Sequence, residues 1–393
     1  MLRLAVLSDL HVYEGDGSEA DKPSFLATGA PEDLVEWHPF TGLSSLIARE
    51  GLASDFLLCG GDMGDKASPP AIMYAWQKLH ATASQLGAQL LATAGNHDMD
   101  SRHNHNDFDA KGILQGLVPS FPTGAPGSDD VFWARNFALI EHEFCRIVIL
   151  NSSAYHGHAD EFSHGRVATR TISTLRQRLR EASLQRINIL LCHHHPYRFA
   201  DIDVEDYSEM KGGAQLLELL SDATLGDWLI VHGHKHYPRL CYAPGGAGSP
   251  VVFSAGSFSA TLYPDLGARA RNQFYLFEIP TDAAELGLVG TFRSWDWIPA
   301  RGWQPAQDLS GLPGSGGFGL RDSPSALARQ IATFIASNGS QYVTWEEILT
   351  EFPRLRYILP DDRTNMFTLL ERQNIDVLRG DVATIQFSKR PGL

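Results

Sequence analysis

Five short polar clusters, each directly after an apolar run, hold the side chains of this sequence that are best suited to chemistry. They are Asp9-Leu10-His11, Gly61-Asp62, Gly95-Asn96-His97-Asp98, His193-His194-His195-Pro196 and Gly233-His234-Lys235-His236. Together they offer carboxylate, imidazole and amide donors without a thiolate, which suits Mn, Fe, Zn, Co or Ni. Two such ions about 3.5–4 Å apart can clamp the attacking and leaving oxygens of an in-line displacement. The clusters therefore predict a two-metal hydrolytic site.

The spacing within the clusters indicates how the donors share ions. Asp9 and His11, like His234 and His236, lie two residues apart, and residues so placed share a face of an extended strand. Asp62 follows two glycines that permit a tight turn, and its two carboxylate oxygens can bridge both ions. We therefore expect each pair to reach one ion and Asp62 to reach two.

The remaining donors come from the third and fourth clusters. Asn96 offers a neutral carbonyl oxygen, while His193 and His194 compete for one further position that strand alternation does not assign. Each cluster alone is common by chance, and a lone histidine is more often packed or exposed than bound to a metal. Five clusters in order, each at the end of an apolar run, favour the metal site over that interpretation.

The order D-x-H, G-D, G-N-H-D, H-H-P, G-H-x-H resembles the calcineurin-like metallophosphoesterase superfamily, over roughly residues 1–297. The resemblance implies an α/β fold, the four-layer αββα sandwich, with two metal ions (Mn, Fe or Zn) and a bridging hydroxide as nucleophile. The ligands it implies for the first ion are Asp9, His11, Asp62 and His236. Those for the second are Asp62, Asn96, His234 and one histidine of the triplet. The H-x-P pattern selects His194, with His193 as the nearest rival.

The same resemblance implies roles for the two residues after Asn96. His97 would contact the substrate phosphate and protonate the leaving oxygen, and Asp98 would orient that imidazole. Protein Ser/Thr phosphatases of the superfamily carry G-D-x-V-D-R-G, whereas Lys66 follows Asp65 here. With His164 in an H-G-R sequence, the pattern is more similar to the cyclic-nucleotide and glycerophosphodiester phosphodiesterase branch. We expect hydrolysis of a small phosphodiester or phosphomonoester; a nuclease and a non-catalytic scaffold are the alternatives.

The elements that must position the clusters alternate between strand and helix. Apolar runs at residues 2–8, 56–59, 89–94, 187–192 and 228–231 end at the clusters, and helical patterns cover 69–87 and 173–183. This alternation predicts an α/β domain whose ligands gather at the carboxyl ends of the strands. Runs at 137–142, 146–151, 251–254, 273–279 and 288–295 predict a second, more antiparallel sheet.

Two long loops, 12–41 and 99–130, interrupt this pattern, and loops of such length are usually functional or disordered. Arg102, His103 and His105 in the second loop fit substrate contacts and a solvated loop equally well. For Tyr155, His156 and His158 a surface loop is favoured over a pocket. A buried joint is favoured over ring stacking for an aromatic group near the end of the large domain, which comprises Phe292, Trp295, Trp297 and Trp303.

The C-terminal residues have the element order of a winged helix. Helical patterns at 325–336, 345–352 and 361–373 combine with a β-like segment at 341–344 and hairpin strands at 375–378 and 382–387 around Arg379-Gly380-Asp381. We divide the chain into a catalytic domain (1–300), a linker (301–320, Gly- and Pro-rich at 311–319) and a small α+β winged-helix-like domain (321–393). Acids and bases nearly cancel over residues 321–393, and the candidate recognition helix at 361–373 has three acids against two bases. Protein docking or self-association is therefore favoured over nucleic acid.

Composition restricts the partners and the compartment. The net charge of −14 argues against a protein that coats nucleic acid. The four cysteines form no C-x-x-C pair, which suggests a reducing compartment, and we expect the cytoplasm. The short N-terminal apolar run ends at Asp9 and predicts a core strand, not a signal peptide. No apolar run reaches membrane-spanning length, so no membrane partner is expected.

Overall fold

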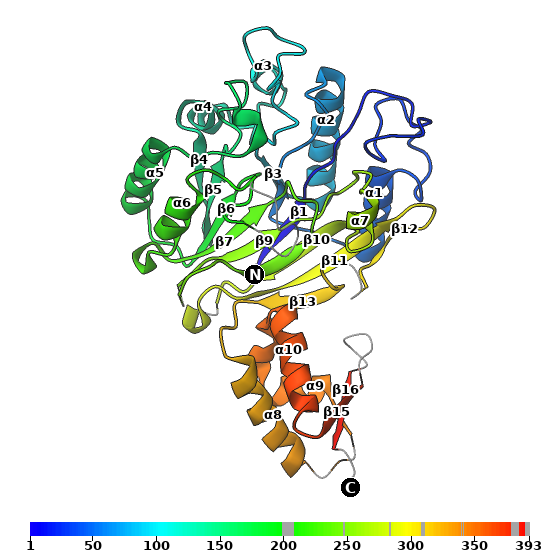
Figure 1. The fold of residues 1–393 in the computed structure, drawn as a ribbon, viewed down its shortest axis with the longest axis vertical. Helices are drawn as coiled ribbons and strands as arrows, with labels where there is room; N and C mark the ends of the chain where they lie inside the picture. The colour runs from blue at the N-terminus through cyan, green and yellow to red at the C-terminus, as the bar shows by residue number, and fades with distance from the viewer. Residues whose placement is uncertain are drawn as a thin grey trace.

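The computed structural model describes residues 1–198, 208–246, 248–282, 284–307, 311–338, 340, 342–378 and 385–389. Figure 1 shows a large part with two stacked sheets flanked by helices, and a smaller, mostly helical part beneath it. The first sheet has the order β12-β11-β10-β1-β2-β3, with β13 also paired to β11. Its strands are β1 (Leu2–Leu7), β2 (Phe56–Cys59), β3 (Gln89–Ala92), β10 (Asn272–Ile279), β11 (Gly290–Ile298), β12 (Gly302–Pro305) and β13 (Ser315–Phe318).

The second sheet has the order β4-β5-β6-β7-β9-β8. Its strands are β4 (Phe137–Glu141), β5 (Cys145–Leu150), β6 (Ile187–Leu191), β7 (Asp227–His232), β8 (Arg239–Tyr242) and β9 (Val251–Ser254). In the first sheet β1–β2 and β2–β3 are parallel pairs, and the pairs that involve β10, β11, β12 and β13 are antiparallel. In the second sheet β5, β6, β7 and β9 are parallel, and the outer strands β4 and β8 pair antiparallel. Both sheets are therefore mixed.

This topology corrects the predicted division into a parallel sheet and an antiparallel one. The strands that end in the five clusters are split, three in the first sheet and two in the second. Apolar runs reveal that a strand is buried on both faces, but they carry no information about which sheet a strand joins. The two sheets must therefore face each other for the clusters to meet.

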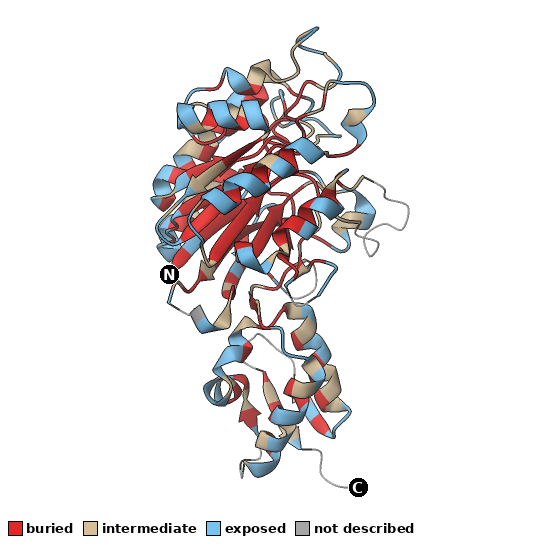
Figure 2. Cartoon of the chain, turned by 90° about the vertical axis from the view of Figure 1, so that its left-hand side faces the viewer, coloured by how far each residue is buried: buried red, intermediate tan, exposed pale blue. Residues whose placement is uncertain are grey.

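Helices cover the outer face of each sheet and complete the predicted four layers. Along β6, Ile189 faces the core shared by the two sheets, whereas Leu190 faces the core formed with α5 (Thr169–Glu181) and α6 (Gly213–Leu220). Helices α1 (Pro39–Glu50) and α2 (Pro69–Leu86) pack on the first sheet. Figure 2 shows the buried strands between exposed helix surfaces. Alternate burial on both sides explains why the strands appear in the sequence as continuous apolar runs.

Short elements occupy the connecting loops. They are α3 (Gly112–Gln115), α4 (Pro126–Arg135), α7 (Pro264–Gly267), and the single turns η1 (Glu161–Ser163), η2 (Ala223–Leu225) and η3 (Ala284–Leu286). The predicted loop at residues 99–130 therefore contains α3 and the start of α4. No helix among the described residues is long and apolar enough to cross a membrane.

The smaller part has the predicted winged-helix order and a core of its own. Its elements are α8 (Pro324–Ser337), β14 (Val343–Thr344), α9 (Trp345–Glu351), η4 (Pro353–Tyr357), α10 (Pro360–Glu371), β15 (Ile375–Leu378) and β16 (Gln386–Lys389). Trp345, Phe367 and Phe387 pack with ring centroids 5.5–6.1 Å apart. The hairpin tip Arg379-Gly380-Asp381, predicted from sequence, lies outside the described residues.

The Gly- and Pro-rich segment 311–319, expected to be part of a linker, contains the strand β13. Strand β13 pairs with β11 from Gly290↔Phe318 to Arg293↔Ser315, so the first sheet continues into this segment. A Cβ on Gly317 would overlap the Arg356 carbonyl oxygen, which shows how closely η4 approaches β13. Residues 308–310 of the expected linker lie outside the described part.

The aromatic group at the joint is buried, as expected. Phe292, Trp295, Trp297 and Trp303 are each at most 3% exposed, and the Trp303 indole N–H donates to the Pro39 carbonyl at 2.9 Å. These rings therefore fill the core between β11, β12 and α1 and are not open for stacking on a ligand.

Candidate metal centre

The five clusters meet at the carboxyl ends of β1, β2, β3, β6 and β7. The backbone there is unusual, because five predicted ligands have positive φ: Asp9 (54°), His11 (49°), Asp62 (52°), His234 (75°) and His236 (52°). Residues other than glycine rarely adopt this conformation, and such residues concentrate at functional sites. The spacing predicts that each donor pair shares one face of an extended strand, and this is wrong. Strands β1 and β7 end before the donor pairs, and left-handed turns orient the side chains.

The loops contact one another through backbone and glycine. The N–H groups of Asp9 and His11 donate to the carbonyls of Gly61 and Asp62 at 2.9 and 3.0 Å. A Cβ on Gly95 would overlap the Asp62 carboxylate, so only glycine allows this close approach. The glycine of G-N-H-D therefore serves the packing of two loops that each carry a donor.

One group of donor atoms comprises Asp9, His11 and His236, with Asp62 beside it. The Nε2 atoms of His11 and His236 lie 3.1 Å apart, and His236 Nε2 lies 3.3 Å from Asp9 Oδ1. His11 Nε2 is 3.5 Å from Asp62 Oδ2. Both carboxylates are buried. Nitrogen and oxygen donors that face each other in a buried place are the arrangement expected around a cation.

A second group shares the Asp62 carboxylate. Asn96 Oδ1 lies 2.9 Å from His234 Nδ1 and 3.0 Å from His193 Nε2, and that Nε2 lies 3.4 Å from Asp62 Oδ2. The Nδ1 of His193 is 2.8 Å from the Gly60 carbonyl, which can only accept, so Nδ1 carries a proton. This contact turns Nε2 toward Asp62 and Asn96.

The electrostatics of this group favour positive charge. Burial alone lowers the pKa of His193, but the carboxylates of Asp62 and Asp9 outweigh it and raise that pKa to about 9. A place where carboxylates hold a buried imidazole as a cation will also hold a metal cation, which competes with the proton.

His194 lies behind His193. Its Nδ1 is 3.0 Å from Ser152 Oγ, and its buried Nε2 has no hydrogen-bond partner among the described residues. The donor atoms of His193, His194 and His234 all lie within 4.8 Å of one another. The structure thus brings both rival histidines to the centre but places His193 against Asn96 and Asp62.

His97 lies beside the first group, with its ring 4.6 Å from that of His11. Its Nδ1 is 3.0 Å from Asp65 Oδ1, and about a third of its side chain is exposed. Burial lowers the pKa of His97, but the carboxylates of Asp62 and Asp65 raise that pKa by more than burial lowers it, so the net shift is upward. An imidazole that keeps its proton and faces solvent beside the donors can act as a general acid.

Asp98 does not contact His97 as expected. Its Oδ1 accepts from the Met63 and Gly64 N–H groups at 2.7 and 3.1 Å, and its Oδ2 accepts from Gly95 N–H at 2.8 Å. Asp98 therefore clamps two loops together, and Asp65 orients the His97 imidazole. The sequence does contain a signal for this role, because a second carboxylate, Asp65, follows Asp62 by three residues. From the sequence we used Asp65 only to locate Lys66.

A family model described as calcineurin-like phosphoesterase matches residues 2–254, which is more than half of the chain. The protein belongs to the calcineurin-like phosphoesterase family. A second model, described as wHTH-Calcineurin_assc, matches residues 316–371. These matches agree with the superfamily and the winged helix inferred from the sequence.

Proteins similar to this chain are found among curated sequences and among solved structures. The chain is 26% identical over 231 residues to a cAMP/cGMP dual specificity phosphodiesterase of Mycobacterium tuberculosis, covering 59% of this chain and 60% of the relative. Similar solved structures include the phosphopantetheinyl hydrolase of the same organism (15% identity, TM-score 0.34, 65% and 89% coverage). Another is the 5'-nucleotidase precursor of Thermus thermophilus (13% identity, TM-score 0.37, 75% and 53% coverage).

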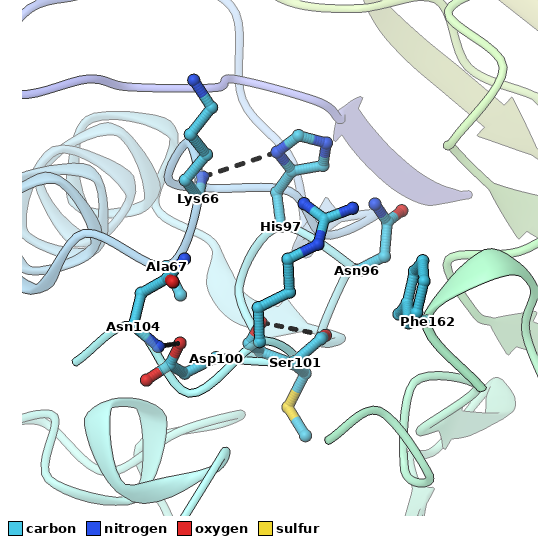
Figure 3. Close-up of a pocket in the computed structure, with 10 residues that line it drawn as sticks. Lys66, Ala67, Asn96, His97, Asp100, Ser101, Asn104 and Phe162 are labelled. Carbon is cyan, nitrogen blue, oxygen red and sulfur yellow. Dashed lines mark hydrogen bonds between the residues drawn. The ribbon is translucent and has the colours of Figure 1, made fainter. Parts of the chain in front are cut away.

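Three residues of the second long loop, Arg102, His103 and His105, fitted either substrate contacts or a solvated loop in the sequence, and the structure distinguishes them. Arg102 lines a small pocket of about 150 Å³ that also includes Asn96 and His97 (Figure 3). His103 and His105 instead contact backbone carbonyls and hold the loop. Of these three residues, only Arg102 lines the pocket.

His156 was expected on a surface loop, and the structure shows that this was wrong. It is 4% exposed, its Nδ1 lies 3.2 Å from Ser101 Oγ, and its Nε2 lies 3.2 Å from the His164 carbonyl. Tyr155 is half-buried and His158 is exposed. The pattern of polar residues after β5 does not distinguish a buried histidine from its exposed neighbours.

Proposed function

We propose that this protein is a dinuclear metal-dependent phosphodiesterase that acts on a small phosphodiester. The observation that carries the proposal is the pair of donor groups that share one buried carboxylate, Asp62. The donors are carboxylate, imidazole and amide atoms without a thiolate, which suits Mn, Fe or Zn. Family membership supports phosphoric ester hydrolysis as the reaction.

The residues would divide between two ions. Asp9, His11, Asp62 and His236 would hold the first, and Asp62, Asn96, His234 and a histidine of the triplet the second. For that last position we propose His193 in place of His194, because the Gly60 contact directs its Nε2 toward Asn96 Oδ1 at 3.0 Å. His194 then stays behind the site, hydrogen-bonded to Ser152.

Ions bound here supply charge neutralisation and a hydroxide nucleophile at neutral pH. The protein's own residues hold the ester and move the proton. His97 would contact the phosphate and release a proton from Nε2 to the leaving oxygen, while Asp65 retains Nδ1. Asp98 keeps the two loops in register through three backbone N–H bonds. Asp98 is therefore proposed as a positioning residue.

A phosphodiester fits better than a phosphoprotein. Lys66, which stands where protein phosphatases of the superfamily have arginine, is largely exposed and lies 3.7 Å from Asp65. The similarity to a cAMP/cGMP phosphodiesterase supports the same choice. Cytoplasmic location and the absence of a membrane partner are kept as predictions, as is a protein-docking role for the winged helix.

The test combines turnover with metal analysis. Protein loaded with Mn²⁺ is expected to hold two ions per chain and to release p-nitrophenol from bis(p-nitrophenyl) phosphate. Asp62→Asn is expected to lose at least one ion and all turnover, because it weakens the shared ligand. If the wild-type protein holds two ions yet cleaves neither this diester nor p-nitrophenyl phosphate, the proposal is wrong and the non-catalytic scaffold replaces it.

A further inference from the structure

The pocket beside His97 contains a guanidinium with no anionic partner in the described part of the chain. Arg102 lies over the ring of Phe162, with its Cζ 5.1 Å from the ring centroid, and its side chain makes no ion pair with any described residue. The ring is 39% exposed. Stacking on one face orders a guanidinium but leaves its N–H edge open. The edge of Arg102 is therefore available to a ligand.

Two carboxylates close to this pair along the chain, Asp100 and Glu161, are engaged elsewhere. Asp100 accepts three backbone N–H groups, from Asn104, His105 and Asn106, at 2.7–2.8 Å. Glu161, which precedes Phe162, binds Arg166 through both oxygens at 2.6 and 2.7 Å. Arg102 therefore has no ion-pair partner among the described residues, and it lies in a pocket that Asn96 and His97 also line.

The two loops that carry Arg102 and Phe162 are joined on both sides of the arginine. Ser101 Oγ lies 3.2 Å from His156 Nδ1, and His103 Nε2 lies 3.1 Å from the Gly157 carbonyl. The residues immediately before and after Arg102 thus bind the segment that leads to Phe162. The backbone on both sides of the exposed Arg102 is therefore anchored before any ligand arrives, which lowers the entropic cost of binding.

We infer that Arg102 binds a second phosphate of the substrate, separate from the phosphodiester that is cleaved. Lys66 lines the same pocket, and Phe162 fixes the plane in which the guanidinium donates two parallel N–H bonds. The inference rests on the proposed function and specifies its substrate class. Substrates are phosphodiesters that carry an additional phosphate near the scissile bond.

The test compares two dinucleotides that differ by one phosphate, ApA and its 5'-phosphorylated form pApA. A charge-assisted contact predicts that kcat/KM for pApA exceeds that for ApA by roughly 10–100-fold. Arg102→Gln should bring this ratio close to one, and Arg102→Lys should keep part of it. Arg170→Gln, at an exposed arginine on α5, is the matched control and should keep the full ratio.

Binding provides a readout that does not need turnover. Calorimetry on Mn²⁺-loaded His97→Gln protein should show tighter binding of pApA than of ApA, and Arg102→Gln on that background should remove the difference. Equal binding of the two, or a preference that survives Arg102→Gln, overturns the inference. If no ester is cleaved but the preference is present and depends on Arg102, the proposed catalysis fails while the phosphate subsite stands.

Discussion

The 3.0 Å contact between His97 Nδ1 and Asp65 Oδ1 occupies Nδ1, so Nε2 is the imidazole nitrogen left to act on a substrate. Replacing His97 with Gln should leave both ions in place and lower kcat by roughly 10²–10⁴-fold, the usual contribution of a general acid. Turnover of bis(p-nitrophenyl) phosphate and metal content measured on the same sample check both statements. His158→Gln, an exposed histidine, is the control. Loss of an ion from His97→Gln would show that His97 is a ligand.

The two rival histidines can be separated by metal stoichiometry. Because His193 Nε2 faces Asn96 and Asp62, His193→Ala should bind one ion fewer than the wild type. His194→Ala should keep both ions, with some loss of stability from the cavity it leaves. Elemental analysis after gel filtration distinguishes these outcomes. The reverse pattern would restore His194, the residue that the H-x-P pattern selected.

At this scale the sequence predicted the residue types well and their geometry poorly. The donors of Asp9, His11, Asp62 and His236 do converge, because each follows an apolar strand whose end is fixed by the sheet. Strand alternation does not decide between His193 and His194, because both lie beyond Leu191, where β6 ends. Their orientation depends on contacts with loops from distant parts of the chain, which for His193 are Gly60 and Asn96 and for His194 is Ser152.

At the scale of elements, helix α1 begins at an unusual cap. His38 is buried, and its Nδ1 accepts the Thr41 N–H at 3.2 Å, while Nε2 lies 3.0 Å from the Tyr74 hydroxyl. Burial lowers the pKa of His38 to about 4, with Glu32 opposing and Lys78 adding to the shift. The folded protein therefore keeps this imidazole neutral at pH values where the unfolded chain protonates it.

This cap predicts a pH dependence of stability. Between the ordinary histidine pKa of about 6.5 and the folded value of about 4, the unfolded chain binds an extra proton, so stability falls as pH falls. His38→Asn keeps an acceptor for the cap but does not titrate. Urea unfolding at pH 7 and pH 5 should show a smaller loss for His38→Asn than for the wild type. An equal loss would mean that His38 does not titrate with folding.

The sequence predicts single strands more accurately than it predicts how the strands assemble into sheets. Runs such as 56–59 and 251–254 match β2 and β9 residue for residue, because burial on both faces leaves an unbroken apolar signal. Strand β13 was missed because its sequence, Ser-Gly-Gly-Phe, is typical of a linker. Its pairing with β11 comes from the sheet it joins and not from its own residues.

At the scale of the whole molecule, the pairing of β12 and β13 with β11 predicts which truncated fragment of the chain is the more stable. A chain that ends at residue 300 loses both strands and uncovers the core that Trp303 and Phe318 fill. Burying a large apolar side chain contributes about 1.5–3 kcal/mol, so this fragment should unfold at a clearly lower temperature than one that ends at 321. Thermal unfolding of the two fragments tests this. Equal midpoints would show that β12 and β13 contribute nothing to the sheet's stability.

The donors come from both sheets: Asp9, His11, Asp62 and Asn96 follow strands of the first, and His193, His234 and His236 follow strands of the second. Ions bound as proposed would therefore fasten the two halves of the sandwich together at one edge, and chelation should open that edge. Trypsin should digest EDTA-treated protein faster than Mn²⁺-loaded protein, since a ligand that binds only the folded state protects it. Metal supply in the cell would then set how long each copy survives as well as how fast it works.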